Sequence, residues 1–150
     1  MGTIVGRITG RWRKPRFDVL VLAVLLVVGA LLIIGCKAPS QIIEDITVQE
    51  AFDLIEEEQD NPDFVIIDVR TPEEYDGGHL ENAVMIDFRA DDFEDRISEL
   101  DRDKTYVIYC RTGVRSAGAL DVMERLGFTE VYNILEGIVG WTDAGFPVVQ

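Results

Sequence analysis

The run Phe64–Val69, rich in β-branched residues, constrains the fold of this chain more than any other feature of its sequence. Runs of this kind are typical of strands buried on both faces of a parallel sheet. Amphipathic patterns accompany it: one helix is predicted over 48–58, after a capping box, and another over 114–126, closed by Gly127. Strands that alternate with helices predict an α/β fold with a mostly parallel sheet.

The remaining segments continue this alternation. Further strands are predicted at 83–87, 105–109 and 131–133, and further helices at 72–76, 92–100 and 137–144. The predicted fold class is therefore α/β, with a central, mostly parallel sheet flanked by helices on both faces. Ligands of such sheets bind beyond the carboxyl ends of the strands. Asp68, Arg70 and Cys110 lie there, at the ends of two predicted strands.

Residues 1–36 differ in composition from the rest of the chain. Five Lys or Arg residues lie within 1–16, and 19–34 is apolar or small throughout. A basic head before an apolar stretch is typical of an export signal. The end of this stretch, Ile33–Cys36, resembles the lipobox of bacterial lipoproteins, in which Cys36 would be lipidated. An uncleaved membrane anchor is the alternative interpretation. Both predict a membrane-anchored protein whose domain lies on the extracytoplasmic side of the cell envelope.

The chain is predicted to consist of a signal or anchor over 1–36, a linker over 37–45 and one domain over 46–150. Residues 36–150 hold nine Lys or Arg and 27 Asp or Glu, a net charge of −18. So acidic a body argues against nucleic acid as a partner. The sequence contains no metal-ligand spacing and no Gly-rich nucleotide loop, so we expect neither a metal nor a cofactor.

The chemistry is expected in the segment Cys110–Ser116, which connects the strand predicted at 105–109 to the helix predicted at 114–126. Backbone N–H groups at such a turn, together with the helix dipole, favour anions. They can lower the pKa of a thiol from about 8.5 to roughly 3.5–7.5. The only other cysteine is Cys36, so the domain is predicted to contain neither a disulfide nor a second thiol that could resolve an intermediate.

Four blocks in this order resemble the single-domain rhodaneses of the rhodanese/Cdc25 phosphatase superfamily, and the resemblance covers 44–149. The blocks are Ile67–Arg70, then Glu74-Tyr75 with Gly78–Ala83, then Cys110–Ser116, and finally Val131–Asn133 with Gly137–Trp141. One departure is Glu136, where the family often has a glycine. It bears on the geometry of that loop.

The resemblance implies a sulfurtransferase without a cofactor. The Cys110 thiolate would take the outer sulfur of thiosulfate or a similar anionic donor as a persulfide. It would then pass this sulfur to cyanide or to a thiol, including a protein thiol. The donor would be bound by the residues of the loop, which are Arg111, Thr112, Gly113, Val114 and Arg115.

Three further residues are expected to support this site: Asp68, Arg70 and Glu74. Arg115 is expected to pair with Asp68 or Glu74, although it could face the substrate instead. His79 is the only histidine, and we expect it to anchor the turn at 78–83 rather than to form a catalytic dyad.

The spacing between Cys110 and Arg115 separates the two branches of the superfamily. Phosphatases wrap a phosphate with Cys-x5-Arg, whereas this chain has Cys-x4-Arg, a smaller ring suited to a sulfur atom. Sulfur transfer is therefore favoured over phosphatase or arsenate reductase chemistry. A non-catalytic persulfide carrier or binding module remains an alternative, and the sequence leaves the donor, the acceptor and the oligomeric state open.

Overall fold

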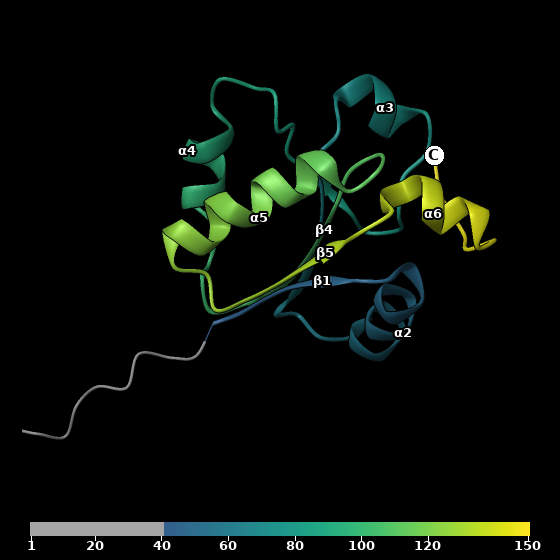
Figure 1. Ribbon diagram of the computed structural model, residues 1–150, viewed down its shortest axis with the longest axis horizontal. Helices are drawn as coiled ribbons and strands as arrows, with labels where there is room; N and C mark the ends of the chain where they lie inside the picture. The colour runs from purple at the N-terminus through teal and green to yellow at the C-terminus, as the bar shows by residue number, and fades with distance from the viewer. Residues whose placement is uncertain (1–40) are drawn as a thin grey trace, which may run out of the picture. The chain divides into compact units, whose positions relative to one another are not determined.

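Five parallel strands form the central sheet of the computed structural model, which describes residues 41–150 (Figure 1). Their order across the sheet is β1-β5-β4-β2-β3. The elements in chain order are β1 (Ile42–Ile46), α2 (Val48–Glu58), β2 (Phe64–Asp68), α3 (Pro72–Asp76), β3 (Val84–Met85), α4 (Phe93–Ser98), β4 (Thr105–Tyr109), α5 (Val114–Leu126), β5 (Glu130–Ile134) and α6 (Gly137–Asp143). The predicted fold class is confirmed.

Helices cover both faces of the sheet, with α4 and α5 on one face and α2 and α6 on the other (Figure 1). Because side chains alternate along a strand, β4 contributes to both cores. Ile108 and the adjoining Cys110 pack against the core that holds Met123 of α5. Val107 and Tyr109 belong to the opposite core. Cys110 therefore lies beneath α5, on the face that this helix covers.

The linker predicted over 37–45 is wrong in its last residues, because Ile42–Ile46 forms β1, parallel to β5. This strand lies at an edge of the sheet. Buried and exposed side chains do not alternate regularly along it, since Ile43 is half-buried and both Glu44 and Asp45 are exposed. Charged residues are common on edge strands, since only one side of the strand is paired. Glu44 and Asp45 interrupt the apolar run, so the segment lacks the sequence pattern of a central strand.

The segment 1–36, with its predicted lipidation site Cys36, lies outside the described residues. Within residues 41–150, no helix combines the length and the apolar character needed to cross a membrane.

Local sequence signals predicted most of the other elements correctly. The capping boxes that open α2 and α3 are both present, and Gly127 ends α5 with φ of 85°. The strand predicted at 83–87 is shorter, since only Val84 and Met85 pair with β2. Beyond it, the amide of Phe88 donates to the carbonyl of Val69 at 3.2 Å, so the chain stays close to the end of β2.

Candidate active site

The loop that holds Cys110 begins where β4 ends and leads into α5 at Val114. Its turn depends on Gly113, which has φ of 86°. A Cβ at Gly113 would overlap the carbonyl oxygen of Leu135, so both the backbone angle and the close approach require glycine. Cys110 itself is only 1% exposed. The loop thus places a buried thiol directly before the first turn of a helix.

The start of α6 holds this loop from the other side. The amides of Ile138 and Val139 donate to the carbonyls of Cys110 and Arg111, at 2.9 and 3.1 Å. Gly137, with φ of 57°, allows this contact, because a Cβ there would lie 2.5 Å from the Cys110 carbonyl oxygen. Two carbonyls of the loop are therefore bound to α6.

The surroundings of Cys110 favour its thiolate. Burial raises the pKa of the thiol, but the Ser116 hydroxyl and the amides of Ser116, Thr112 and Arg115 together lower the pKa below its ordinary value. Hydrogen bonds to the charged form act in this direction. A thiolate, unlike a thiol, is a strong nucleophile.

Ser116 is a site residue to which the sequence analysis gave no role. Its hydroxyl lies 3.5 Å from the Cys110 sulfur and 3.1 Å from the Gly113 carbonyl oxygen, and its side chain is fully buried. A hydroxyl has one proton to donate, so these two acceptors compete for it. Its place in the first turn of the helix after Cys110 was the signal that could have identified it.

Arg115 forms a bidentate ion pair with Glu74, and both nitrogen–oxygen distances are 2.7 Å. The hydrogen bond with Arg115 lowers the pKa of the Glu74 carboxyl to about 2. Glu74 also accepts from the amide of Thr71 at 3.2 Å, which completes the capping box of α3. Of the two acids considered for Arg115, Glu74 is the partner, and Asp68 is not.

Asp68 instead pairs with Arg70, at 2.6 Å, and both residues are buried. Arg70 also donates to the carbonyl of Gly78 at 2.7 Å, and its guanidinium lies 5.6 Å from the centre of the Tyr109 ring. The pair therefore ties the end of β2 to the turn after α3. Because α3 carries Glu74, this pair positions the partner of Arg115.

His79 contacts Tyr75 and Val149. Its ring stacks on Tyr75 at 3.7 Å, and its backbone pairs with that of Val149. The turn at 78–83 is thus anchored to the end of the chain. Among the described residues, no group of three or more His, Cys, Asp or Glu side chains could hold a metal ion.

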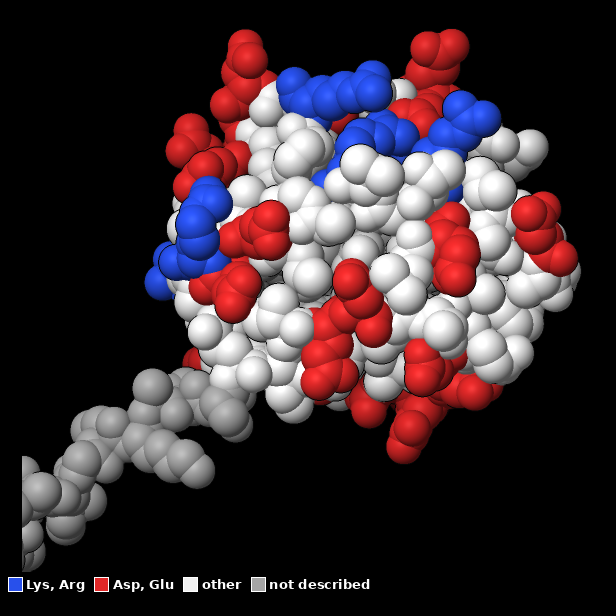
Figure 2. Space-filling model, viewed as in Figure 1, with Lys and Arg blue, Asp and Glu red and all other residues white. Residues whose placement is uncertain are grey.

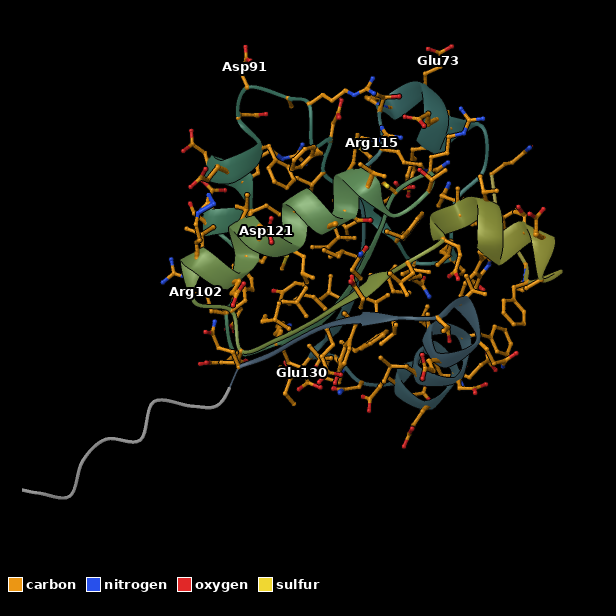
Figure 3. The ribbon with its side chains drawn as sticks, viewed as in Figure 1. Glu73, Asp91, Arg102, Arg115, Asp121 and Glu130 are labelled. Atoms are coloured by element: carbon orange, nitrogen blue, oxygen red, sulfur yellow. The ribbon has the colours of Figure 1, made fainter. Side chains whose placement is uncertain are left out.

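An open cavity of about 810 Å³ lies over the loop. Its lining residues are Thr71, Glu73, Glu74, Arg89, Arg111, Thr112, Val114 and Arg115. Figure 3 shows Arg115 at the start of α5, on the side of the domain where α3 lies. Basic side chains gather at this edge in Figure 2, with acidic side chains beside them, and a second basic group lies at the left of the visible face. The cavity is therefore suited to an anion.

Arg111 and Arg89 contribute exposed cations to this cavity. Arg111 was expected here because it follows Cys110, but Arg89 was not. Arg89 is far from Cys110 in the sequence, and only the path of the chain between β3 and α4 brings it to the cavity. A second cavity, of about 320 Å³, shares Arg111 with the first and extends to Val139 and Val148.

Comparisons with known proteins agree with this geometry. The model of the rhodanese-like domain family matches residues 50–144. A sulfurtransferase of Allochromatium vinosum is 34% identical over 90 residues, which cover 60% of this chain and 82% of that protein. The probable adenylyltransferase/sulfurtransferase MoeZ of Mycobacterium tuberculosis is 40% identical over 76 residues, which cover 51% of this chain and 19% of MoeZ.

Solved structures also resemble this chain. A rhodanese-related protein of Thermoplasma volcanium aligns with a TM-score of 0.61 at 28% identity, over 71% of this chain and 97% of that one. The family match includes both partners of the Glu74–Arg115 ion pair and the whole segment Cys110–Ser116. The chain therefore belongs to the rhodanese-like domain family.

Proposed function

We propose that this protein is a sulfurtransferase in which Cys110 accepts a sulfur atom from thiosulfate or a similar anionic donor. The observation that carries the proposal is the buried Cys110 thiol, whose pKa is lowered by hydrogen bonds from the loop and from Ser116. The names of the relatives in Allochromatium vinosum and Mycobacterium tuberculosis include sulfurtransferase, which supports the reaction class.

In the first half of the reaction, the Cys110 thiolate attacks the outer sulfur of thiosulfate. A new sulfur–sulfur bond forms to Cys110, the sulfur–sulfur bond of the donor breaks, and sulfite leaves with the electron pair. The product is a persulfide anion. Amides that stabilise the thiolate, those of Thr112, Arg115 and Ser116, line the same small space and can stabilise this anion. Arg111, an exposed residue that lines the cavity, can orient the donor.

In the second half, an acceptor attacks the outer sulfur of the persulfide and restores the Cys110 thiolate. Cyanide or a thiol would serve, and a protein thiol is included among these acceptors. The ion pair of Arg115 with Glu74 supports sulfur transfer over phosphatase chemistry, because a phosphatase arginine binds the phosphate oxygens in a bidentate manner. Here Glu74 already occupies that side of the guanidinium.

The experiment is the intact mass of the full-length chain after incubation with thiosulfate. A gain of one sulfur atom that cyanide removes as thiocyanate is expected. Cys110→Ser should gain nothing, whereas Cys36→Ser, the matched control, should behave as the wild type. If no anionic donor adds sulfur to Cys110, the domain is a binding module rather than a sulfurtransferase.

The composition of residues 1–36 supports a second part of the proposal, that the domain is attached to a membrane on its extracytoplasmic side. Lipidation would occur at Cys36. Labelling of cells with a fatty-acid probe tests this. The label should appear on the wild-type chain and be lost in Cys36→Ser but not in Cys110→Ser. A chain that stays in the membrane fraction without label would instead carry an uncleaved anchor.

A further inference from the structure

We infer that Arg89 determines specificity for the sulfur donor, by binding an anionic group that the donor carries away from its reactive sulfur. This inference rests on the proposed function. Arg89 lines the cavity above the loop together with Arg111 and Arg115, although it comes from the segment between β3 and α4. The donor it selects would be an organic thiosulfonate that also bears a carboxylate or sulfonate.

The backbone holds Arg89 in place. Its amide donates to the Asp87 carboxylate at 2.9 Å, which forms a local turn. The preceding residue, Phe88, packs against Phe93 with ring centres 5.1 Å apart and also covers Gly118 of α5. A Cβ at Gly118 would lie only 2.7 Å from the Phe88 ring. Phe88 can therefore approach α5 this closely only because residue 118 is a glycine. The turn at Asp87 and the packing of Phe88 thus fix the backbone of Arg89 at the cavity.

Arg89 and Arg115 differ in whether an acidic side chain pairs with them. Arg115 is neutralised by Glu74, whereas Arg89 and Arg111 make no ion pair with any residue in the part of the chain that the structure describes. Both are therefore available to an anion, even though the exposed Glu73 lines the same cavity and the domain as a whole is strongly acidic. A charge-assisted hydrogen bond from a guanidinium to a carboxylate is a favourable contact.

The size and lining of the cavity point to an organic donor. A volume of about 810 Å³ is far larger than a small inorganic dianion and lies within the range for organic ligands. Val114 lines the same cavity and is 77% exposed, so it offers an apolar surface beside the cations. A donor with an apolar body and a distal anionic group would use both features.

The reaction of such a donor is balanced without an additional reagent. The Cys110 thiolate forms a bond to the outer sulfur of a thiosulfonate anion, the sulfur–sulfur bond of the donor breaks, and a sulfinate leaves with the electron pair. The persulfide forms on Cys110 as it does with thiosulfate. Arg89 takes no part in these bond changes and acts on the affinity for the donor.

The test compares two donors that differ by one distal carboxylate, benzenethiosulfonate and 4-carboxybenzenethiosulfonate. We expect the wild-type full-length chain to prefer the carboxylated donor in kcat/KM for persulfide formation. Arg89→Gln should reduce kcat/KM for that donor roughly threefold to tenfold more than it reduces kcat/KM for benzenethiosulfonate. Arg89→Glu should reverse the preference.

The matched control is Arg102→Gln, which removes the same charge from an exposed residue that precedes β4, far from Arg115 in Figure 3. It should keep the wild-type preference. Equal preference in wild type and Arg89→Gln, or an equal loss for both donors, would overturn the role of Arg89 while the sulfurtransferase reaction stands. Absence of persulfide with every donor would overturn the proposed function and this inference with it.

Discussion

Arg115 and Glu74 join the first turn of α5, which follows the Cys110 loop, to α3 through two nitrogen–oxygen contacts of 2.7 Å, although 41 positions of sequence separate them. Glu74 completes the capping box of its own helix with the same carboxylate. One side chain therefore fixes the start of α3 and the guanidinium beside Cys110. Loss of the Glu74 charge should disturb the stability of the domain and the geometry of the loop together.

The Glu74 ion pair should make stability depend on pH in the acid range. The folded-state pKa of Glu74, about 2, is below its ordinary value of 4.5. Its contribution is therefore complete above about pH 4.5 and lost as the pH falls towards 2. We expect Glu74→Gln to lower the free energy of unfolding at pH 7 by roughly 1–3 kcal/mol, with a smaller difference at pH 2.5. Urea unfolding measures both values, and a difference independent of pH would contradict the ion-pair explanation.

The rate of persulfide formation should follow the ionisation of Cys110. Because the site lowers the pKa of this thiol, single-turnover rates with thiosulfate should reach half their maximum at a lower pH than the ionisation of an unperturbed cysteine would give. Ser116→Ala removes the side-chain hydrogen bond to the sulfur and should move this midpoint to higher pH. Ser98→Ala, which removes an exposed hydroxyl elsewhere, is the control. Identical midpoints in the wild type and both variants would show that the Ser116 hydroxyl does not lower the pKa of Cys110.

Gly137 should be required for its close contact with the Cys110 loop, and not only for its positive φ. Both Gly137 and Gly145 have positive φ, at 57° and 81°, but only Gly137 meets other backbone atoms where a Cβ would be placed. Gly145→Ala should therefore cost about 1 kcal/mol from its backbone angle alone. We expect Gly137→Ala to cost at least 1 kcal/mol more and to slow persulfide formation. Urea unfolding and the single-turnover rate measure the two effects, and equal costs would show that the loop tolerates the Cβ.

The buried pair of Asp68 and Arg70 should contribute far more than an exposed one. Asp68→Asn leaves the Arg70 charge buried without its partner, so the free energy of unfolding should fall by about 3–5 kcal/mol. Glu94→Gln breaks the exposed pair with Arg125, and its cost should stay within about 1 kcal/mol. Chemical denaturation of both variants provides the comparison. Similar costs would mean that water reaches the Asp68–Arg70 pair.

Local patterns in the sequence predicted the elements that carry the thiol. The run Phe64–Val69 predicted β2, and Gly127 predicted the end of α5, since each signal acts within a few residues of itself. Strand β1 was missed, because an edge strand with one half-buried face lacks the apolar continuity of a central strand. The position of Cys110 at the end of β4 was predicted from the strand that precedes it.

Contacts between distant segments were harder to predict. Asp68 and Glu74 were both plausible partners for Arg115, because Asp68 ends β2 and Glu74 follows it within a few residues. Glu74 is the partner because α3 brings it to Arg115, whereas Asp68 is already paired with Arg70. Arg89 could not be placed at the cavity at all, since its position depends on Phe88 covering Gly118, a contact that no pattern in either segment predicts.

The hydrogen bonds from α6 to the loop have a consequence for the biosynthesis of the protein. The carbonyls of Cys110 and Arg111 find their donors, the amides of Ile138 and Val139, about 28 residues later in the chain. A nascent chain that has emerged only as far as β5 holds the thiol but lacks the segment that shapes the loop. The loop around Cys110 is thus completed only after α6 has been made, when the strands of both cores have already been synthesised.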